Sequence, residues 1–297
     1  MTVIDKLLAP DSHFQERFFF LAKRFVAGES IDAALEAVGA LNAEGMTASL
    51  DFLGEDVTDA AEARRTRDTY LEMFDAIEKS RARTNVSLKL TALGLLLDEN
   101  LCLRHLEEIL ARAQTLEDPF VRIDMEGSNV TEATLRVFER AFAQHRNVGI
   151  VIQSYLRRSP GDVEHAIALG ARVRLCKGAY NEPPALAYPD MATIRREYLR
   201  LAEALLARGT YPAIATHDER LIAAVKTYTG EHAIAKDKFE FQLLYGVRPD
   251  LQRELVREGY NVRVYVPFGT HWAGYFYRRI TERKENALFA LRSLFSR

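Results

Sequence analysis

The chain has little cysteine: Cys102 and Cys176 are the two in 297 residues. Two isolated cysteines form neither a disulfide framework nor a CxxC pair, which is typical of a reducing compartment. The chain also lacks an excess of one charge, with 40 Lys and Arg against 42 Asp and Glu and a formal net charge of −2. A protein without a positive field does not attract nucleic acid or an anionic membrane over its whole surface. Any charged ligand must therefore be held by a local cluster of side chains.

Long apolar runs and common targeting or phosphate-binding patterns are also absent. The longest apolar run, around residues 91–97, is far shorter than the ~20 residues that span a bilayer. The N-terminal residues lack a basic region, a long apolar stretch and a small-residue cleavage site. Neither GxGxxG nor GxxxxGK[ST] is present, which argues against the two common nucleotide-binding folds. We expect a cytoplasmic protein, with peripheral contact at the inner face of the plasma membrane as the further option.

Eight short β-branched or apolar segments are present, and segments with apolar residues at helical spacing separate most of them. The expected strands are Met46–Leu53, Val86–Leu90, Phe120–Asp124, Val148–Gln153, Arg172–Leu175, Pro212–Thr216, Phe239–Leu243 and Val262–Pro267. Eight strand–helix units in ~250 residues predict an α/β fold of the TIM-like (β/α)8 barrel type, since an open doubly wound sheet usually has five or six strands. We expect residues 1–44 to form helices packed on the barrel, and residues 45–297 to form the barrel itself.

Polar side chains close most of the expected strands, where barrel enzymes carry their catalytic residues. These residues are Asp51, Lys89, Asp124, Gln153, Lys177, Thr216 and His217. Lys89 either pairs with Asp124 on the next strand or meets a substrate carboxylate. His217 is either a hydrogen-bonded structural residue or a ligand. Arg174, inside an apolar strand, needs an anionic partner to justify its burial.

A pair of arginines follows the last expected strand. On a helix, the sequence YFYRRITE places Tyr275, Arg278, Arg279 and Glu282 on one face. Two adjacent guanidiniums suit a small anion such as a carboxylate, which each of them can bind through paired hydrogen bonds. The alternative is a solvated helix face with an ordinary ion pair between Arg278 and Glu282. The position directly after a strand and turn favours the anion site.

Three other interpretations remain open from these residues. Lys89 or Lys177 could form a Schiff base with a carbonyl substrate, as in a class I aldolase. A metal-dependent hydrolase would use His217, Asp218, Asp51 and Glu240, although neither HxH nor HExxH is present. A non-catalytic barrel could dock a partner through an apolar tail, which comprises Leu288, Phe289, Leu291, Leu294 and Phe295. That last interpretation leaves the charged strand ends unexplained.

The segments SLKLT, RIDME, VRLCKGAY, ATHD, EFQLLYG and PFG, followed by YFYRRITE, closely resemble the flavin-dependent proline dehydrogenase family, in order along residues 45–297. The chain is similar to the short, monofunctional bacterial form. The resemblance implies a distorted barrel with FAD across the strand ends and the last helix above the mouth. It also implies oxidation of L-proline to 1-pyrroline-5-carboxylate, the first step of proline degradation to glutamate. Hydride would pass to flavin N5, a membrane quinone would reoxidise the flavin, and a separate 1-pyrroline-5-carboxylate dehydrogenase would use the product.

The resemblance also implies roles for individual residues. We expect no metal site and no nucleic-acid partner. Lys89, Arg278 and Arg279 would bind the proline carboxylate, and Tyr265 would pack against the pyrrolidine ring. The positions that match FAD contacts are Met125, Gln153, Lys177, Gly178, Ala179, Thr216 and His217. Arg174 would lie beside the reactive edge of the flavin, and Asp124 would be an active-site aspartate that is either the amine base, a partner of Lys89 or a control on closure. Asp218 departs from the family pattern, which more often has Asn there.

Overall fold

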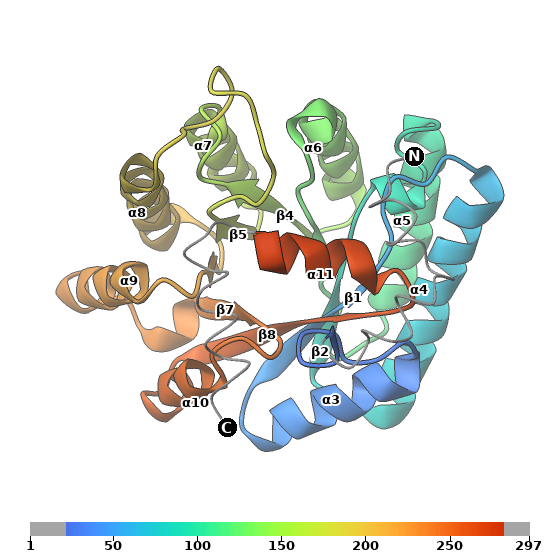
Figure 1. Ribbon diagram of the computed structural model, residues 1–297, viewed down its shortest axis with the longest axis horizontal. Coiled ribbons are helices and arrows are strands. Elements are labelled where there is room, and N and C mark those ends of the chain that lie inside the picture. The colour runs from blue at the N-terminus through green and yellow to red at the C-terminus, as the bar shows by residue number, and fades with distance from the viewer. Residues whose placement is uncertain (1–21, 282–297) are drawn as a thin grey trace.

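Eight parallel strands close into a barrel in sequence order, as a computed structural model of the chain shows (Figure 1). The structure describes residues 22–281, with side chains as far as Phe276. The strands are β1 (Thr47–Phe52), β2 (Thr84–Leu88), β3 (Val121–Ile123), β4 (Val148–Gln153), β5 (Val173–Cys176), β6 (Ala213–Ala215), β7 (Glu240–Leu244) and β8 (Asn261–Phe268). This confirms the predicted TIM-like fold, and no observed strand end lies more than two residues from its predicted position.

A ring of helices surrounds the barrel (Figure 1). They are α3 (Ile31–Ala43), α4 (Ala60–Ser80), α5 (Glu99–Ala113), α6 (Ser128–Gln144), α7 (Ser159–Leu169), α8 (Met191–Arg208), α9 (Glu219–Glu231) and α10 (Pro249–Arg257), with the short 3-10 helices η1 (Thr91–Leu93) and η2 (Lys236–Lys238). Several helices begin at an aspartate whose side chain accepts a backbone N–H of the first turn, as Asp59, Asp98 and Asp190 do. Such caps satisfy N–H groups that have no partner within the helix.

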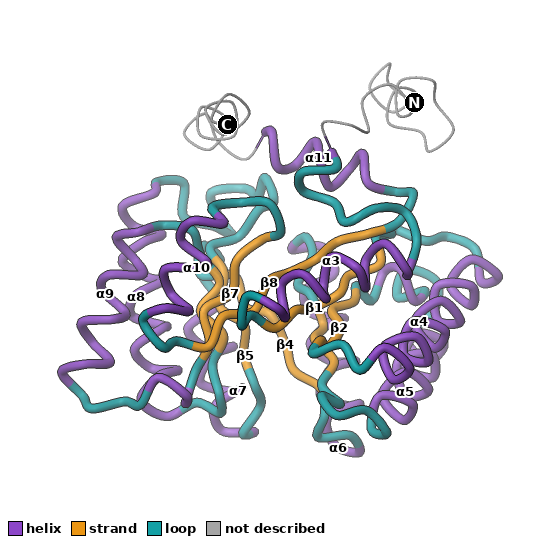
Figure 2. The backbone as a smooth tube through the Cα atoms, turned by 90° about the horizontal axis from the view of Figure 1, so that it is seen from below, coloured by secondary structure: helices purple, strands orange, loops and turns teal. Residues whose placement is uncertain are grey.

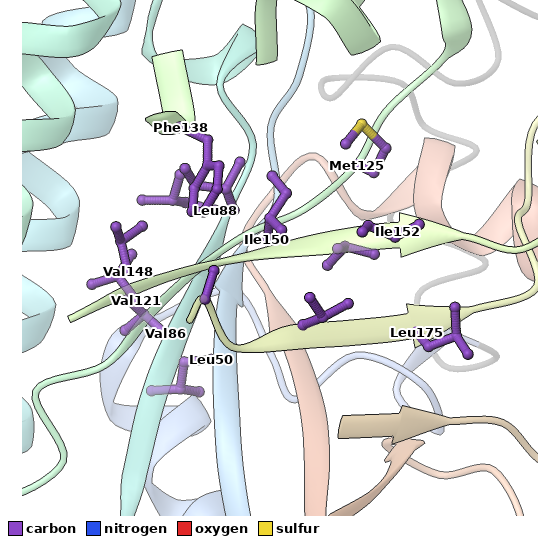
Figure 3. Packing of buried hydrophobic residues seen from close by; sticks show 14 of the residues in the cluster. Leu50, Val86, Leu88, Val121, Met125, Phe138, Val148, Ile150, Ile152 and Leu175 are labelled. Carbon is purple, nitrogen blue, oxygen red and sulfur yellow. The ribbon is translucent and has the colours of Figure 1, made fainter. Parts of the chain in front are cut away.

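The main hydrophobic core lies between the strands and the surrounding helices. Leu50, Leu88 and Ile150 are each at most 1% exposed, and Figure 3 shows Leu88 next to Phe138 of α6. The alternate residues of the strands point into the barrel, and many of these are polar. The buried polar residues of the strands include Ser49, Ser87, Arg122, Arg174, Glu240, Gln242 and Arg263. The inside of the barrel is therefore held by hydrogen bonds and ion pairs more than is usual for this fold, whose interior is mostly branched and apolar.

The last described helix, α11 (Trp272–Thr281), lies across one end of the barrel instead of beside it. Figure 1 places α11 over the centre of the strands, and Figure 2, turned by 90°, places it above them. Trp272 and Tyr275 pack with Phe25, Val26 and Leu53 in a small second hydrophobic cluster. The outer face of β8 is covered by α3, which also packs against β1. Because α3 takes the place where a helix after β8 would normally pack, α11 is available to cover the strand ends.

Within residues 22–281, none of the helices combines the length and the apolar character that crossing a membrane requires. Residues 1–21 of the predicted N-terminal helical segment lie outside the described residues, as does the apolar tail from Leu288 to Phe295.

Candidate active site

Lys89 and Asp51 form a buried ion pair at the C-terminal ends of β1 and β2. Nζ of Lys89 lies 2.9 Å from Oδ2 and 3.2 Å from Oδ1 of Asp51. The two residues approach because Asp51 is in register with Ser87, and Lys89 follows two residues later on the same face. The predicted structural pairing of Lys89 with Asp124 is therefore wrong, and the partner comes from the preceding strand. Both side chains are more than 90% buried.

The charge of Lys89 is set by this pairing. Burial disfavours the ammonium, but the carboxylates of Asp51 and Asp124 outweigh burial and raise the pKa of Lys89 above its ordinary value. A lysine that forms a Schiff base must be neutral, which requires the opposite shift. The other strand-end lysine, Lys177, forms an ion pair with Asp218 at 2.6 Å. The geometry thus favours neither lysine as an aldolase nucleophile.

Arg174 is held from three sides. Its Nη1 donates to Oδ1 of Asp124 at 2.6 Å, its Nη2 to Oγ of Ser87 at 2.8 Å, and its Nε to Oε1 of Gln242 at 2.5 Å. The side chain is only 7% exposed, so Asp124 supplies the anionic partner that burial of this arginine demands. A guanidinium fixed in this way cannot rotate freely and presents its remaining N–H groups in one direction.

Tyr265 of β8 completes this group. Its hydroxyl donates to Oδ2 of Asp124 at 2.8 Å, and the guanidinium carbon of Arg174 lies 5.3 Å from the centre of its ring. Burial and the nearby carboxylates of Asp124 and Asp51 raise the pKa of Tyr265 well above its ordinary value. Tyr265 therefore remains a neutral phenol and a hydrogen-bond donor. Asp124 thus accepts from Arg174 on one oxygen and from Tyr265 on the other, while Lys89 pairs with Asp51.

The residues predicted to contact a cofactor lie at or just after the ends of neighbouring strands β3 to β6. Gln153, the last residue of β4, donates from Nε2 to the carbonyl of Glu126 at 3.0 Å. Met125, two residues after β3, is 8% exposed. Thr216, directly after β6, accepts the backbone N–H of Asp218 at 3.1 Å. The barrel therefore brings together side chains that are far apart in the sequence.

His217 and Asp218 have structural contacts at this end of the barrel. Nε2 of His217 accepts the backbone N–H of Leu244 at 3.0 Å, so that nitrogen carries no proton. Asp218 caps α9 and also accepts from Arg195 at 2.7 Å. His217 thus has the hydrogen-bonded structural role that was one of its two options. The hydrogen bond fixes the orientation of its imidazole ring.

Lys177, Gly178 and Ala179 form an irregular segment directly after β5. Gly178 has φ +113°, a conformation that side chains with a Cβ rarely adopt. A Cβ at this position would lie 2.2 Å from the ring of Tyr155, so the backbone packs directly on that ring. Oγ of Ser154, the residue before Tyr155, is buried with no hydrogen-bond partner within the described residues. The glycine is thus required by Tyr155, while the lysine cation and the unsatisfied hydroxyl are groups that a phosphate-bearing cofactor can bind.

A metal site finds no support in the described part of the chain, where no three His, Cys, Asp or Glu residues are grouped to hold an ion. Glu240, one of the four ligands considered for a hydrolase, begins β7 and pairs with Arg263 at 3.1 Å. That position is at the opposite end of the strand from the loop that carries His217. The proposed set of four ligands is therefore not brought together.

Arg278 and Arg279 belong to α11, so their backbone lies on the helix above the strand ends (Figure 2). Their side chains, and all of Glu282, lie outside the described part of the chain. Their contact with an anion remains a prediction.

Glu126 is a member of this region that the motifs did not single out. Its side chain accepts from the backbone N–H of Thr91 at 3.2 Å and from the hydroxyl of Thr91 at 2.5 Å. The residue is 4% exposed, and this burial raises the pKa of Glu126 to about 7. The sequence could have indicated Glu126 as a site residue, because it lies two residues after Asp124 at a strand end.

The raised pKa predicts how stability depends on pH. A carboxyl that binds its proton more tightly in the folded state stabilises the fold at acid pH, and this contribution is lost as the pH rises from about 4.5 through about 7. Glu126→Gln should remove this pH dependence. The free energy of unfolding of the variant, relative to that of the wild type, should therefore rise by on the order of 2–3 kcal/mol between pH 5 and pH 8. Urea unfolding at the two pH values measures the difference. Glu164→Gln, at an exposed residue paired with Arg208, is the control and should show no such gain; parallel pH profiles for the Glu126 variant and the wild type would contradict the prediction.

Comparison with known proteins places this geometry in context. A profile of the proline dehydrogenase family matches residues 34–292. Proline dehydrogenase 1 of Bacillus subtilis is 42% identical over 273 residues, which is 92% of this chain and 90% of that protein. Proline dehydrogenase of Deinococcus radiodurans is 41% identical over 285 residues, with 94% and 92% covered. Among solved structures, proline utilization A from Bdellovibrio bacteriovorus, inactivated by N-propargylglycine, matches with a TM-score of 0.86 at 26% identity, over 99% of this chain and 37% of that longer one.

Proposed function

Because the chain belongs to the proline dehydrogenase family, we propose that it oxidises L-proline to 1-pyrroline-5-carboxylate with FAD as the electron acceptor. The observation that carries this proposal is the fixed position of Arg174. Its guanidinium is tied to Asp124, Ser87 and Gln242 at the end of the barrel that α11 covers. A buried cation with so many constraints suits a group on which negative charge develops during a reaction.

The substrate carboxylate would be bound by Lys89, Arg278 and Arg279. Lys89 is charged but already neutralised by Asp51, so it cannot by itself offset a second buried carboxylate. The two arginines of α11 would supply the missing positive charge from above. An anchor at the carboxylate fixes one end of a rigid five-membered ring, and Tyr265 would limit rotation of the rest. With α11 over the bound substrate, water would be excluded and each ionic contact strengthened.

FAD, when bound, would accept the hydride that proline loses. The residues that would hold it are Met125, Gln153, Lys177, Gly178, Ala179, Thr216 and His217. Arg174 would stabilise the negative charge that reduction creates. Asp124 would act by orienting Arg174 and Tyr265, because both of its oxygens accept hydrogen bonds from them. This orienting role is a fourth one, beside the amine base, the partner of Lys89 and the control on closure, and these contacts support it.

The later steps complete the proposal. A membrane quinone would reoxidise the reduced cofactor, with the protein in the cytoplasm and in transient peripheral contact with the inner face of the plasma membrane. The product would pass to a separate 1-pyrroline-5-carboxylate dehydrogenase.

The visible spectrum of the purified protein tests the proposal directly. Protein supplied with FAD should show the bands of bound oxidised flavin, and these should bleach when L-proline is added without oxygen. D-Proline is the control for a site that binds the substrate in one orientation. A colourless protein, or one that borohydride links covalently to a carbonyl substrate through a lysine, would favour the aldolase instead.

A further inference from the structure

A chain of polar side chains runs along the inside of the barrel below Arg174. Arg263 of β8 donates from Nε to both oxygens of Glu240 at 3.1 Å. Nε2 of Gln242 donates to Oε1 of Glu240 at 2.5 Å, and Oε1 of Gln242 accepts from Nε of Arg174 at 2.5 Å. All four residues are at most 6% exposed. Arg174 is thus connected through Gln242 to an ion pair near the opposite end of the barrel.

Small residues on β6 make this connection possible. Ala213 is in register with Arg174 on one side and with Glu240 on the other, and Ala215 is in register with Gln242. Residues in register on parallel strands point to the same face, so these two methyl groups lie between the long side chains of β5 and β7. They leave room for Arg174 to reach Gln242 across the intervening strand.

Glu240 dictates which way the amide of Gln242 faces. The carboxylate below requires a donor, so it takes the NH2 group of Gln242 and leaves the amide oxygen directed at Arg174. The flipped amide would place oxygen against the carboxylate and NH2 against the guanidinium, which loses two hydrogen bonds with charged partners. Glutamate at position 242 would set two carboxylates together, and leucine would leave Nε of Arg174 without an acceptor. An amide is the side chain that joins a carboxylate to a guanidinium here.

We propose that Gln242 is the positioning residue that fixes the orientation of Arg174, with its own amide orientation set by the Glu240–Arg263 pair. The consequence for catalysis rests on the proposed role of Arg174 beside the flavin. The orientation itself does not, because it follows from contacts within the barrel. The two statements are therefore tested separately.

The hydrogen bond is tested by NMR of the full-length protein labelled with 15N-arginine, with or without FAD. The Nε–H of Arg174, identified by its absence in Arg174→Lys, should be shifted by its hydrogen bond and slow to exchange with water. In Gln242→Leu it should exchange at least about tenfold faster. Unchanged exchange would overturn the proposal. If Gln242→Leu does not fold, the paired exchange Glu240→Gln with Gln242→Glu keeps one amide and one carboxylate in the chain; it should retain the protected Nε–H, and loss of protection there would also overturn the proposal.

Kinetics test the consequence. Gln242→Leu should reduce its flavin about tenfold more slowly, with the KM for L-proline changed less than about threefold and the flavin midpoint potential lowered. Gln252→Leu is the matched control, since Gln252 is equally buried but donates to the carbonyls of Leu244 and Val247. It should lose stability while keeping the wild-type rate and potential. Equal slowing in both variants would mean a general structural effect and would overturn the proposal. A wild-type protein whose flavin is not reduced by proline would instead refute the proposed function. The NMR result would then still decide whether Gln242 orients Arg174.

Discussion

Arg174→Ala should slow reduction of the bound flavin by L-proline by about 10²–10³-fold, while the KM for proline should change less than about threefold. The reason is that the guanidinium is fixed before any ligand arrives, by Asp124, Ser87 and Gln242. A preorganised cation stabilises developing charge without reorganising at the moment of reaction. Anaerobic stopped-flow measurements over a range of proline concentrations separate the limiting rate from the apparent affinity.

Arg172→Ala is the matched control for this experiment. Arg172 lies two residues earlier, just before β5, and its guanidinium is placed between the rings of Phe120 and Tyr211 at 4.0 and 4.6 Å from their centres. Removing it takes an arginine from the same strand region without touching Asp124 or Tyr265. This variant should be less stable but should reduce flavin at the wild-type rate. Equal rates for Arg174→Ala and the wild type would refute the role given to Arg174.

The fold was predictable because the signal for a buried parallel strand is local. Each strand of this barrel is a short apolar segment, and segments with apolar residues at helical spacing lie on both sides of it. These strand segments recur at the interval of a strand–helix unit. The differences between predicted and observed strands are at the strand ends, where polar residues continue the hydrogen bonding of the sheet. Thr84 and Asn85 belong to β2 although they are polar, because they are buried at the end of the barrel. A pattern based on apolar residues stops before them.

The members of the site were more predictable than their pairing. Strand-end positions identified Lys89, Asp124 and Arg174, since parallel strands place their carboxyl ends on one side of a barrel. The pairing of Lys89 with Asp51 depends on the register of β1 and β2, and the contacts of Asp124 depend on where Arg174 and Tyr265 reach across the barrel. Neither can be derived from a single sequence. Interactions across the barrel, such as that of Gln242 with Arg174, are still further removed from any local pattern.

One signal for the barrel interior was present in the sequence. Polar residues at 240 and 242 flank Phe241, and polar residues at 172 and 174 flank Val173. Such alternation in a strand buried on both faces indicates a polar inner layer facing an apolar outer one. The alternation predicts which residues point inward, but it does not say which donor meets which acceptor.

Lys89→Met should reduce the stability of the protein by about 3–5 kcal/mol at pH 7 and strongly weaken binding of proline. The substitution preserves much of the volume of the side chain but leaves Asp51, which is fully buried, without its cation. Burial already raises the pKa of the Asp51 carboxyl, with the charge of Lys89 opposing that shift, so the variant should raise it further. A carboxyl with a raised pKa in the folded state stabilises the fold at acid pH and loses that contribution as the pH rises. The stability deficit of Lys89→Met should therefore shrink as the pH is lowered from 8 to 5.

Lys177→Met is the control for Lys89→Met. It also removes a lysine at this end of the barrel, but one whose side chain is less buried. The carboxylate partner of Lys177, Asp218, retains Arg195 at 2.7 Å, and the lysine side chain is 25% exposed. Its loss should cost only about 0–1 kcal/mol, with little dependence on pH between 5 and 8. Urea unfolding of the two variants and the wild type, each prepared without FAD, measures the comparison. Equal losses from the two lysines, or a deficit in Lys89→Met that does not change with pH, would show that Asp51 does not depend on Lys89 for its charge.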